Sequence, residues 1–183
     1  MWGLNTATRL ARLRHDDSGA TAVEFAIVAG PFFFLIGCIV ETGLMLFTEY
    51  VLQSSVQEAA RLVRTGQAQE GSRDAGWFKN AVCDTAGVII NCSGDVSVYL
   101  RADATFAALQ SALPSYLSVG ASYGGSATSS SYDCGAAGEA VALVATYDWD
   151  FAFPFMNFLG NFRGGEVRRI YGLAIFRNEP FGS

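Results

Sequence analysis

The feature that most constrains this chain is an apolar run without charge, FAIVAGPFFFLIGCIV, which occupies residues 25–40. As an α-helix rising about 1.5 Å per residue, this run spans roughly 24 Å. It falls short of the hydrocarbon core of a bilayer, which is about 30 Å thick. A helix over residues 20–47 covers the bilayer but draws in Glu24 and Glu41. We therefore expect a membrane-spanning helix with one of these two carboxylates in or near the lipid.

The composition indicates an amphiphilic chain. Of the 183 residues, 51% are hydrophobic and only 16% are charged, whereas a soluble domain has about 25% charged residues. The net charge is −5 at pH 7 and Lys79 is the single lysine. Nucleic-acid binding needs a basic face that neutralises phosphates. We therefore expect room for one domain, a lipid bilayer as partner, and no nucleic-acid partner.

The basic residues around the apolar run predict its orientation. Arg9, Arg12 and Arg14 precede the run, and no Lys or Arg follows it until Arg61. Positive residues tend to stay on the cytoplasmic side of a membrane. We therefore expect the N-terminus inside the cell and the bulk of the chain outside the inner membrane.

An ordinary secretory signal peptide is an alternative interpretation, because it also combines a basic start with an apolar stretch. However, no small-x-small cleavage site follows the run, and residues 44–65 contain neither Gly nor Pro. One face of a helix there is formed by Met45, Leu52, Val56, Ala59 and Val63. The sequence thus predicts one helix over residues 20–65, membrane-spanning to about residue 47, which stops at Gly66.

A cleavage motif, SGATAVEF, lies where the basic leader meets this helix. It consists of Gly19, then Glu24 five residues later, then Phe25. This pattern resembles the type IV prepilin processing signal, in which a membrane aspartyl peptidase cuts after the glycine. The resemblance implies a cytoplasmic leader at residues 1–19 that is removed, a mature N-terminus at Ala20, and roles for Glu24 and Phe25 in processing and assembly.

The spacing of Ala20 and Glu24 has a physical reason. Cleavage frees an α-amine on Ala20, and Glu24 lies four residues later on the same helix face. A lone carboxylate in a bilayer costs about 2.5–3.5 kcal/mol on insertion scales. By resemblance to pilins, the amine of this or a neighbouring subunit is its partner; the alternative is an interfacial Glu that snorkels to headgroups.

Pro31 lacks an N–H and clashes with the preceding turn, so we expect a kink there.

The whole chain resembles the TadE-like family of minor pilins, or pseudopilins, of the tight-adherence (Flp) pilus. The resemblance is carried by GATAVEFAIVAGPFFFLIG, by the polar helix end QEAARLVRTGQAQ, and by AIFRNEPF near the C-terminus. It implies a prepilin-peptidase substrate needed for pilus assembly, adhesion and biofilm formation. The implied partners are the peptidase, other pilin subunits and the assembly platform in the inner membrane of a Gram-negative bacterium. The implied final location is the pilus or cell surface.

Two other functions remain open at this point. One is an uncleaved single-pass scaffold that organises the pilus machinery from the inner membrane. The other is a pseudopilin of a type II secretion-like apparatus, which would act as a piston and not as an adhesive fibre.

The exported part, residues 66–183, has the pattern of a small sheet domain. Short helices are predicted at residues 72–85 and 104–112, and strands at residues 95–101, 139–149 and 168–177. The predicted fold class is therefore α+β, a long N-terminal pilin-like helix followed by a small antiparallel sheet with short helices. Residues 118–131 are rich in Gly and Ser and predict an exposed loop. Phenylalanines gather around Pro154; we interpret them as core or subunit packing, and any exposed ones as an interface.

The cysteines divide by predicted compartment. Cys38 lies in the apolar run and is interpreted as a small buried hydrophobe. Cys83, Cys92 and Cys134 lie in the exported part, where disulfides form. The short spacing favours a Cys83–Cys92 bridge, with Cys134 free or intermolecular, although sequence alone does not fix the pairing. We expect no metal site, because the sequence has no CxxC pair and no His near these cysteines.

The sequence also argues against catalysis. His15, the only histidine, lies in the leader, and no phosphate-binding or dinucleotide-binding motif is present. Asp148 and Asp150 project from the same side of a predicted strand, as a catalytic pair can, but we interpret them as a solvated strand edge. We expect no enzyme activity and no cofactor, and we expect this chain instead to be the substrate of a peptidase.

Overall fold

The computed structural model of the chain describes residues 19–70, 73–87, 89–92, 96–111, 132–161 and 165–181. The chain divides into an N-terminal unit, Met1–Val40, and a second unit, Glu41–Ser183. Residues 1–18 of the predicted leader and the predicted loop at residues 118–131 lie outside the described residues. So do the positions between the other ranges.

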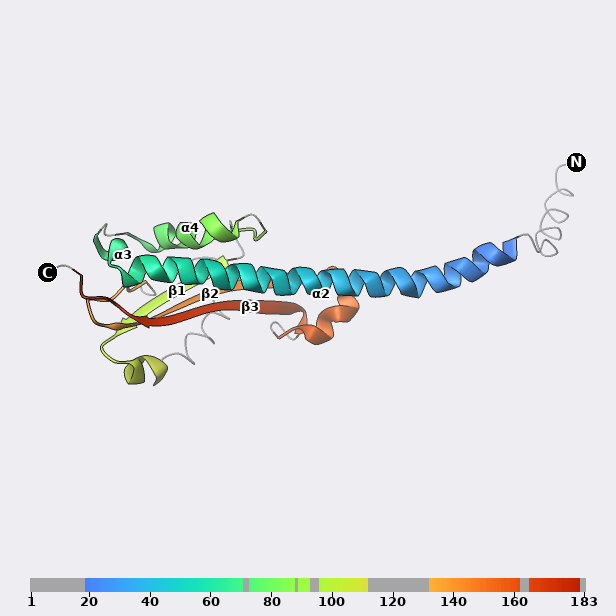
Figure 1. Cartoon of the computed structure of the whole chain (residues 1–183). Helices are drawn as coiled ribbons and strands as arrows, with labels where there is room; N and C mark the ends of the chain where they lie inside the picture. Colours follow the sequence, from blue (N-terminus) through green and yellow to red (C-terminus); the bar gives the residue numbers. More distant parts are fainter. Residues whose placement is uncertain are drawn as a thin grey trace, which may run out of the picture. The chain divides into compact units, whose positions relative to one another are not determined.

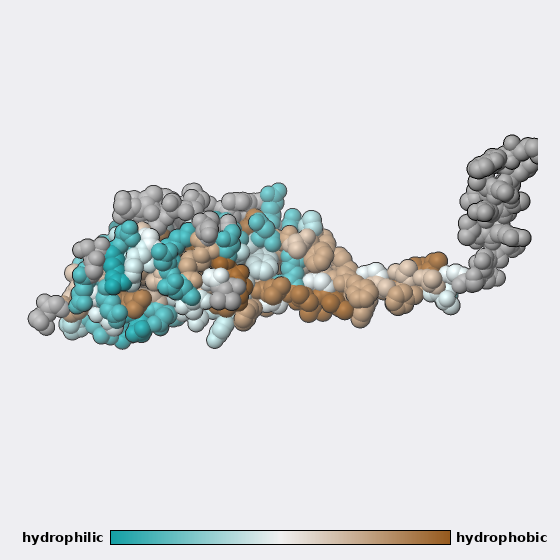
Figure 2. Space-filling model, turned by 90° about the horizontal axis from the view of Figure 1, so that it is seen from above, coloured by the Kyte–Doolittle hydropathy of each residue, from teal (hydrophilic) through white to brown (hydrophobic). Residues whose placement is uncertain are grey.

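The described part of the N-terminal unit, residues 19–40, is helical and apolar. Helix α2, Ala20–Arg64, has 45 residues and passes through Pro31 without a break in its assignment, while the kink expected there stays a prediction. Its first 21 residues belong to the N-terminal unit. Most of their side chains are exposed, and the exposed phenylalanines there include Phe25 at 71% and Phe33 at 65%. In Figure 2 much of this part of the helix has the brown colour of hydrophobic residues. The long helix predicted over residues 20–65 is confirmed.

The second unit is built on a three-stranded antiparallel sheet (Figure 1). Its order is β1 (Val96–Asp103), β2 (Ala140–Asp150) and β3 (Val167–Arg177). The central strand β2 is buried over most of its length, because neighbouring strands flank it and other elements cover it. The predicted α+β class is therefore confirmed.

Short helical elements complete the second unit. They are α3 (Gln67–Glu70), α4 (Ala75–Ala86), a helical turn at residues 106–111 and the 3-10 helix η3 (Pro154–Leu159). Helix α4 begins three residues later than predicted because Asp74 caps it: the Asp74 carboxylate accepts a hydrogen bond from Trp77 N–H at 2.8 Å. The two predicted helices and three predicted strands are all present, with ends shifted by a few residues.

The core lies where the second half of α2 and helix α4 meet the sheet. Fully buried side chains include Leu52 and Val56 from α2, Phe78 from α4, and Leu143 from β2. Gly172 on β3 permits the close approach of α2, since a Cβ there would lie 2.7 Å from Val56 Cγ2 and 3.2 Å from the Leu52 carbonyl oxygen. Helix α2 is thus an integral part of this core and not only an anchor.

The outer edge of β3 is covered by side-chain amides. The Gln53 amide accepts from Leu173 N–H and donates to the Leu173 carbonyl, both at 2.9 Å. The Asn161 amide does the same with Arg169, at 2.7 and 3.1 Å. Each carboxamide therefore takes the place of a neighbouring strand and hydrogen-bonds the backbone N–H and C=O of one residue on this edge. Left unpaired, these groups would favour pairing with another chain.

Gly172→Val is expected to destabilise the second unit by about 1–3 kcal/mol, because the added methyl groups overpack the contact between α2 and β3. Urea unfolding of the full chain in detergent, followed by circular dichroism, measures this change. Gly43→Ala is the matched control, since a Cβ at Gly43 meets no described atom within 4 Å. Equal stability of Gly172→Val and wild type would show that α2 does not pack against β3 as described.

Candidate functional site

The predicted cleavage site lies at the first turn of α2. Gly19 is in a 3-10 turn and Ala20 is the first α-helical residue; both are exposed. Within the described part of the chain, no atom lies within 4 Å of the position that a Gly19 Cβ would take. The packing of these residues therefore does not require glycine. A requirement for glycine at this position would have to come from an external partner such as a peptidase.

Glu24 and Phe25 follow on the same exposed stretch of helix. Ala20 and Glu24 are one turn apart, which brings the backbone nitrogen of Ala20 and the Glu24 carboxylate to one face of α2. Phe25 is 71% exposed. The structure thus groups the four predicted residues, Gly19, Ala20, Glu24 and Phe25, at one accessible helix end, while their roles in processing and assembly stay predictions.

The helix that carries this site has the length and composition of a membrane span. In the described residues, α2 is the one helix that is long and apolar enough to cross a bilayer, and none of its most apolar 18-residue window is buried. The core helix of a soluble protein would be largely buried. A signal sequence passes the same test of length and apolarity, but this helix continues into the packed core of the second unit.

These features define a class of protein in which one N-terminal apolar helix carries a small α+β domain. The family model of TadE-like proteins matches residues 19–61, which begin at the predicted cleavage glycine and end in the packed half of α2. This match confirms the resemblance over residues 19–61, whereas the C-terminal AIFRNEPF lies outside the matched residues. No curated protein and no solved structure matched the chain.

The second carboxylate of the span, Glu41, has a structural role that the sequence did not reveal. It is only 5% exposed, and its Oε1 accepts a hydrogen bond from Ala152 N–H at 2.5 Å. Its buried Oε2 has no partner among the described residues. Glu41 therefore connects the first turn of the packed half of α2 to the segment that follows β2.

Asp148 corrects one sequence interpretation. We expected Asp148 and Asp150 at a solvated strand edge, and for Asp150, which is exposed, this is correct. Asp148 instead forms a two-pronged ion pair with Arg169, at 2.6 Å to Nε and 2.7 Å to Nη2, and the Arg169 side chain is 4% exposed. The register explains the pair, because Asp148 and Arg169 lie directly opposite each other on β2 and β3.

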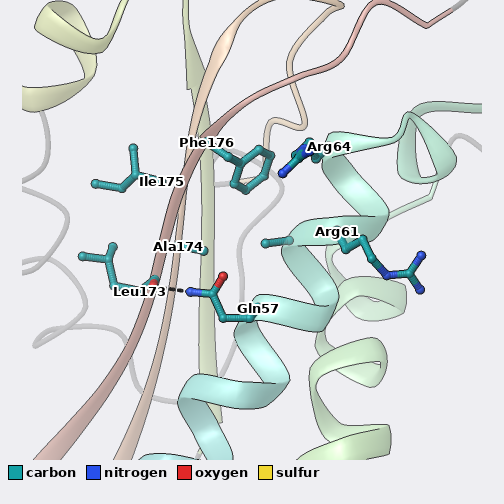
Figure 3. A pocket seen from close by; sticks show the side chains of 8 residues that line it. Gln57, Arg61, Arg64, Leu173, Ala174, Ile175 and Phe176 are labelled. Carbon is teal, nitrogen blue, oxygen red and sulfur yellow. Dashed lines mark hydrogen bonds between the residues drawn. The ribbon is translucent and has the colours of Figure 1, made fainter.

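An open groove lies between α2 and β3 (Figure 3). Its lining comprises Gln57, Ala60, Arg61, Arg64 and residues 173–176. Figure 3 shows the Arg61 guanidinium turned away from β3, and Arg61 and Arg64 pair with Glu58 and Glu179 at 2.6 and 2.8 Å. Because both cations have acidic partners, the groove offers little net charge to a ligand.

No cluster of three or more His, Cys, Asp or Glu is placed to hold a metal ion in the described residues.

The structure joins Cys83 to Cys92, the pair that the spacing favoured, and leaves Cys38 and Cys134 as free thiols. The bridge ties the end of α4 to the segment that precedes β1. Closure of a loop this short stabilises a fold by somewhat under about 3 kcal/mol on the chain-entropy model.

Burial raises the pKa of the Cys134 thiol above its ordinary value, although a hydrogen bond with Tyr132 opposes the shift. The pKa of this thiol is higher in the folded chain than in the unfolded chain. The stability that the protonated thiol contributes is therefore lost as the pH rises from the ordinary thiol pKa through the folded-state pKa. We expect Cys134 to react more slowly with iodoacetamide in the folded chain than in urea near pH 8.5, about the ordinary thiol pKa. Mass spectrometry of a Cys38→Ala chain measures both rates; equal rates would contradict the expected burial of this thiol.

Proposed function

We propose that this protein is a minor pilin, or pseudopilin, of a tight-adherence pilus. The observation that carries the proposal is the TadE-like match, which starts at Gly19 and includes Glu24 on the exposed, apolar first half of α2. In this proposal a prepilin peptidase cuts between Gly19 and Ala20, and the mature helix then leaves the bilayer to pack among other pilin subunits.

The chemistry of the helix supports such a transfer. The apolar face that lipid covers before assembly must be covered by other apolar helices afterwards, so the exposed side chains of residues 20–40 suit both states. The new amine at Ala20 and the Glu24 carboxylate form a complementary pair in an environment of low dielectric. The folded second unit remains outside and needs no rearrangement.

Fractionation tests the proposal against an inner-membrane scaffold. Cells are sheared, and the sheared surface fraction and the inner membranes are probed for the protein by immunoblot. A minor pilin is expected in both fractions in wild-type cells and only in the membranes of cells that lack the prepilin peptidase. Its absence from the sheared fraction of piliated wild-type cells would reject incorporation and favour the scaffold.

A further inference from the structure

An apolar segment after β2 stands out from the rest of the second unit. Residues 151–160, FAFPFMNFLG, contain no charged side chain. Phe155 is 43% exposed and Phe158 is 78% exposed, which is the highest exposure among the large hydrophobic side chains of the described residues. Exposed apolar side chains that gather in this way mark an interaction surface.

This segment is firmly held by the fold. At its start, Ala152 N–H donates to Glu41 on α2 at 2.5 Å. In its middle, Met156 is the buried residue of η3, with 3% exposure. At its end, the Arg168 guanidinium donates to the Leu159 carbonyl at 3.2 Å. The phenylalanines are therefore presented by a constrained turn, and their exposure does not come from a loop without contacts.

The position of the segment along α2 indicates what covers it. The 21 residues from Ala20 to Val40 have mostly exposed side chains, and at about 1.5 Å per residue they span about 31 Å, close to the about 30 Å of a hydrocarbon core. If these residues fill the bilayer, the next turn begins at Glu41 and lies at the outer lipid interface. Glu41 is the residue that binds the start of the apolar segment.

The same level of α2 is itself apolar on its exposed side. Leu44, Leu46 and Phe47 are 49%, 56% and 50% exposed, and Tyr50 is 70% exposed. These side chains and the phenylalanines of η3 belong to the same unit and flank the Glu41 contact. Glu49 is the exposed carboxylate on this stretch of α2. A surface rich in apolar and aromatic side chains that begins where a span leaves the lipid suits the interface between acyl chains and headgroups.

We propose that residues 153–159 form a second membrane contact, in which Phe155 and Phe158 insert into the outer leaflet beside α2 before assembly. This inference rests on the proposed membrane insertion of residues 20–40. The contact would hold the exported domain against the bilayer in a fixed orientation and cover its apolar surface until the helix is extracted into a filament.

Depth measurements on the full chain in lipid vesicles test this contact. Single cysteines replace Phe158, Phe33 or Phe106 in a Cys38→Ala/Cys134→Ala chain, and each is labelled with the same small fluorophore. Phe33 reports the span. Phe106 is the matched control, because it is a 50% exposed phenylalanine near the end of β1 that pairs with the start of β2, roughly 34 Å of strand away from η3. Quenching by nitroxide-labelled lipid and by aqueous iodide is then compared.

We expect the labels at positions 33 and 158 to be quenched several-fold more by the lipid than the label at position 106, and the reverse order with iodide. If only position 33 responds to lipid, the membrane anchor stands and the second contact is wrong. If position 158 is shielded from both quenchers, a protein surface such as a second copy covers it, which also overturns the proposal. If position 33 does not respond to lipid, the membrane insertion itself fails and the contact fails with it.

Discussion

Asp148→Ala is expected to lower the free energy of unfolding of the second unit by about 3–5 kcal/mol, because it removes the carboxylate that forms a two-pronged ion pair with the buried Arg169 guanidinium. The Arg169 side chain is 4% exposed and the Asp148 side chain 20% exposed, so water replaces little of the lost interaction. Small domains are stable by only about 5–15 kcal/mol. The substitution therefore removes a large share of the stability.

Urea unfolding of the full chain in detergent measures this effect. Asp150→Ala is the control, since Asp150 lies two residues along the same strand and is exposed; its expected change is within about 0.5 kcal/mol. A double variant, Asp148→Leu/Arg169→Met, removes both charges together and is expected to recover much of the loss. Equal effects of the Asp148 and Asp150 substitutions would contradict the buried pair.

Glu24→Leu is expected to abolish entry of the protein into the sheared surface fraction while leaving it in the inner membrane. The substitution removes the proposed partner of the Ala20 amine and also removes a carboxylate that costs about 2.5–3.5 kcal/mol in a bilayer. The precursor is therefore expected to be inserted at least as well as wild type, and the loss is one of assembly.

The matched control for Glu24→Leu is Glu49→Gln, which changes an exposed carboxylate on the same helix within the second unit. Immunoblots of sheared and membrane fractions, normalised to total protein, give the comparison. Normal incorporation of Glu24→Leu would show that the carboxylate snorkels to the headgroups and has no part in subunit contacts.

The helix and the strands were predictable because local patterns determine them. The uncharged run at residues 25–40 and the periodic residues from Met45 to Val63 fit only a helix, and α2 covers both. Alternation of Val96, Val98 and Leu100 predicts β1, whose buried positions alternate in the same way. These sequence patterns match the structure because one face of each element packs against the core and the opposite face meets the surroundings of the protein.

The contacts that depend on register were not predictable. Asp148 and Arg169 are 21 residues apart in sequence, and only the pairing of β2 with β3 places them opposite each other. The Gln53 amide meets Leu173 across 120 residues because α2 packs against β3, another contact between segments far apart in the sequence. The sequence placed one of the two carboxylates, Glu24 or Glu41, in or near the lipid, whereas the hydrogen bond between Glu41 and Ala152 depends on how β2 ends. A polar residue in sequence shows a need for a partner and does not identify it.

The candidate site itself was predictable as a motif but not as a function. Gly19, Ala20, Glu24 and Phe25 lie on one exposed helix end, where the fold imposes no role on them. Their meaning depends on a peptidase, on lipid and on other subunits, none of which the fold of a single chain determines.

The most direct test of this account is the N-terminal sequence and intact mass of the protein purified from cells with and without the prepilin peptidase. The account predicts a chain that begins at Ala20 in wild-type cells, and a full-length chain both in the peptidase mutant and in a Gly19→Ala variant. A full-length chain under all three conditions would contradict processing and leave an uncleaved membrane scaffold as the better description.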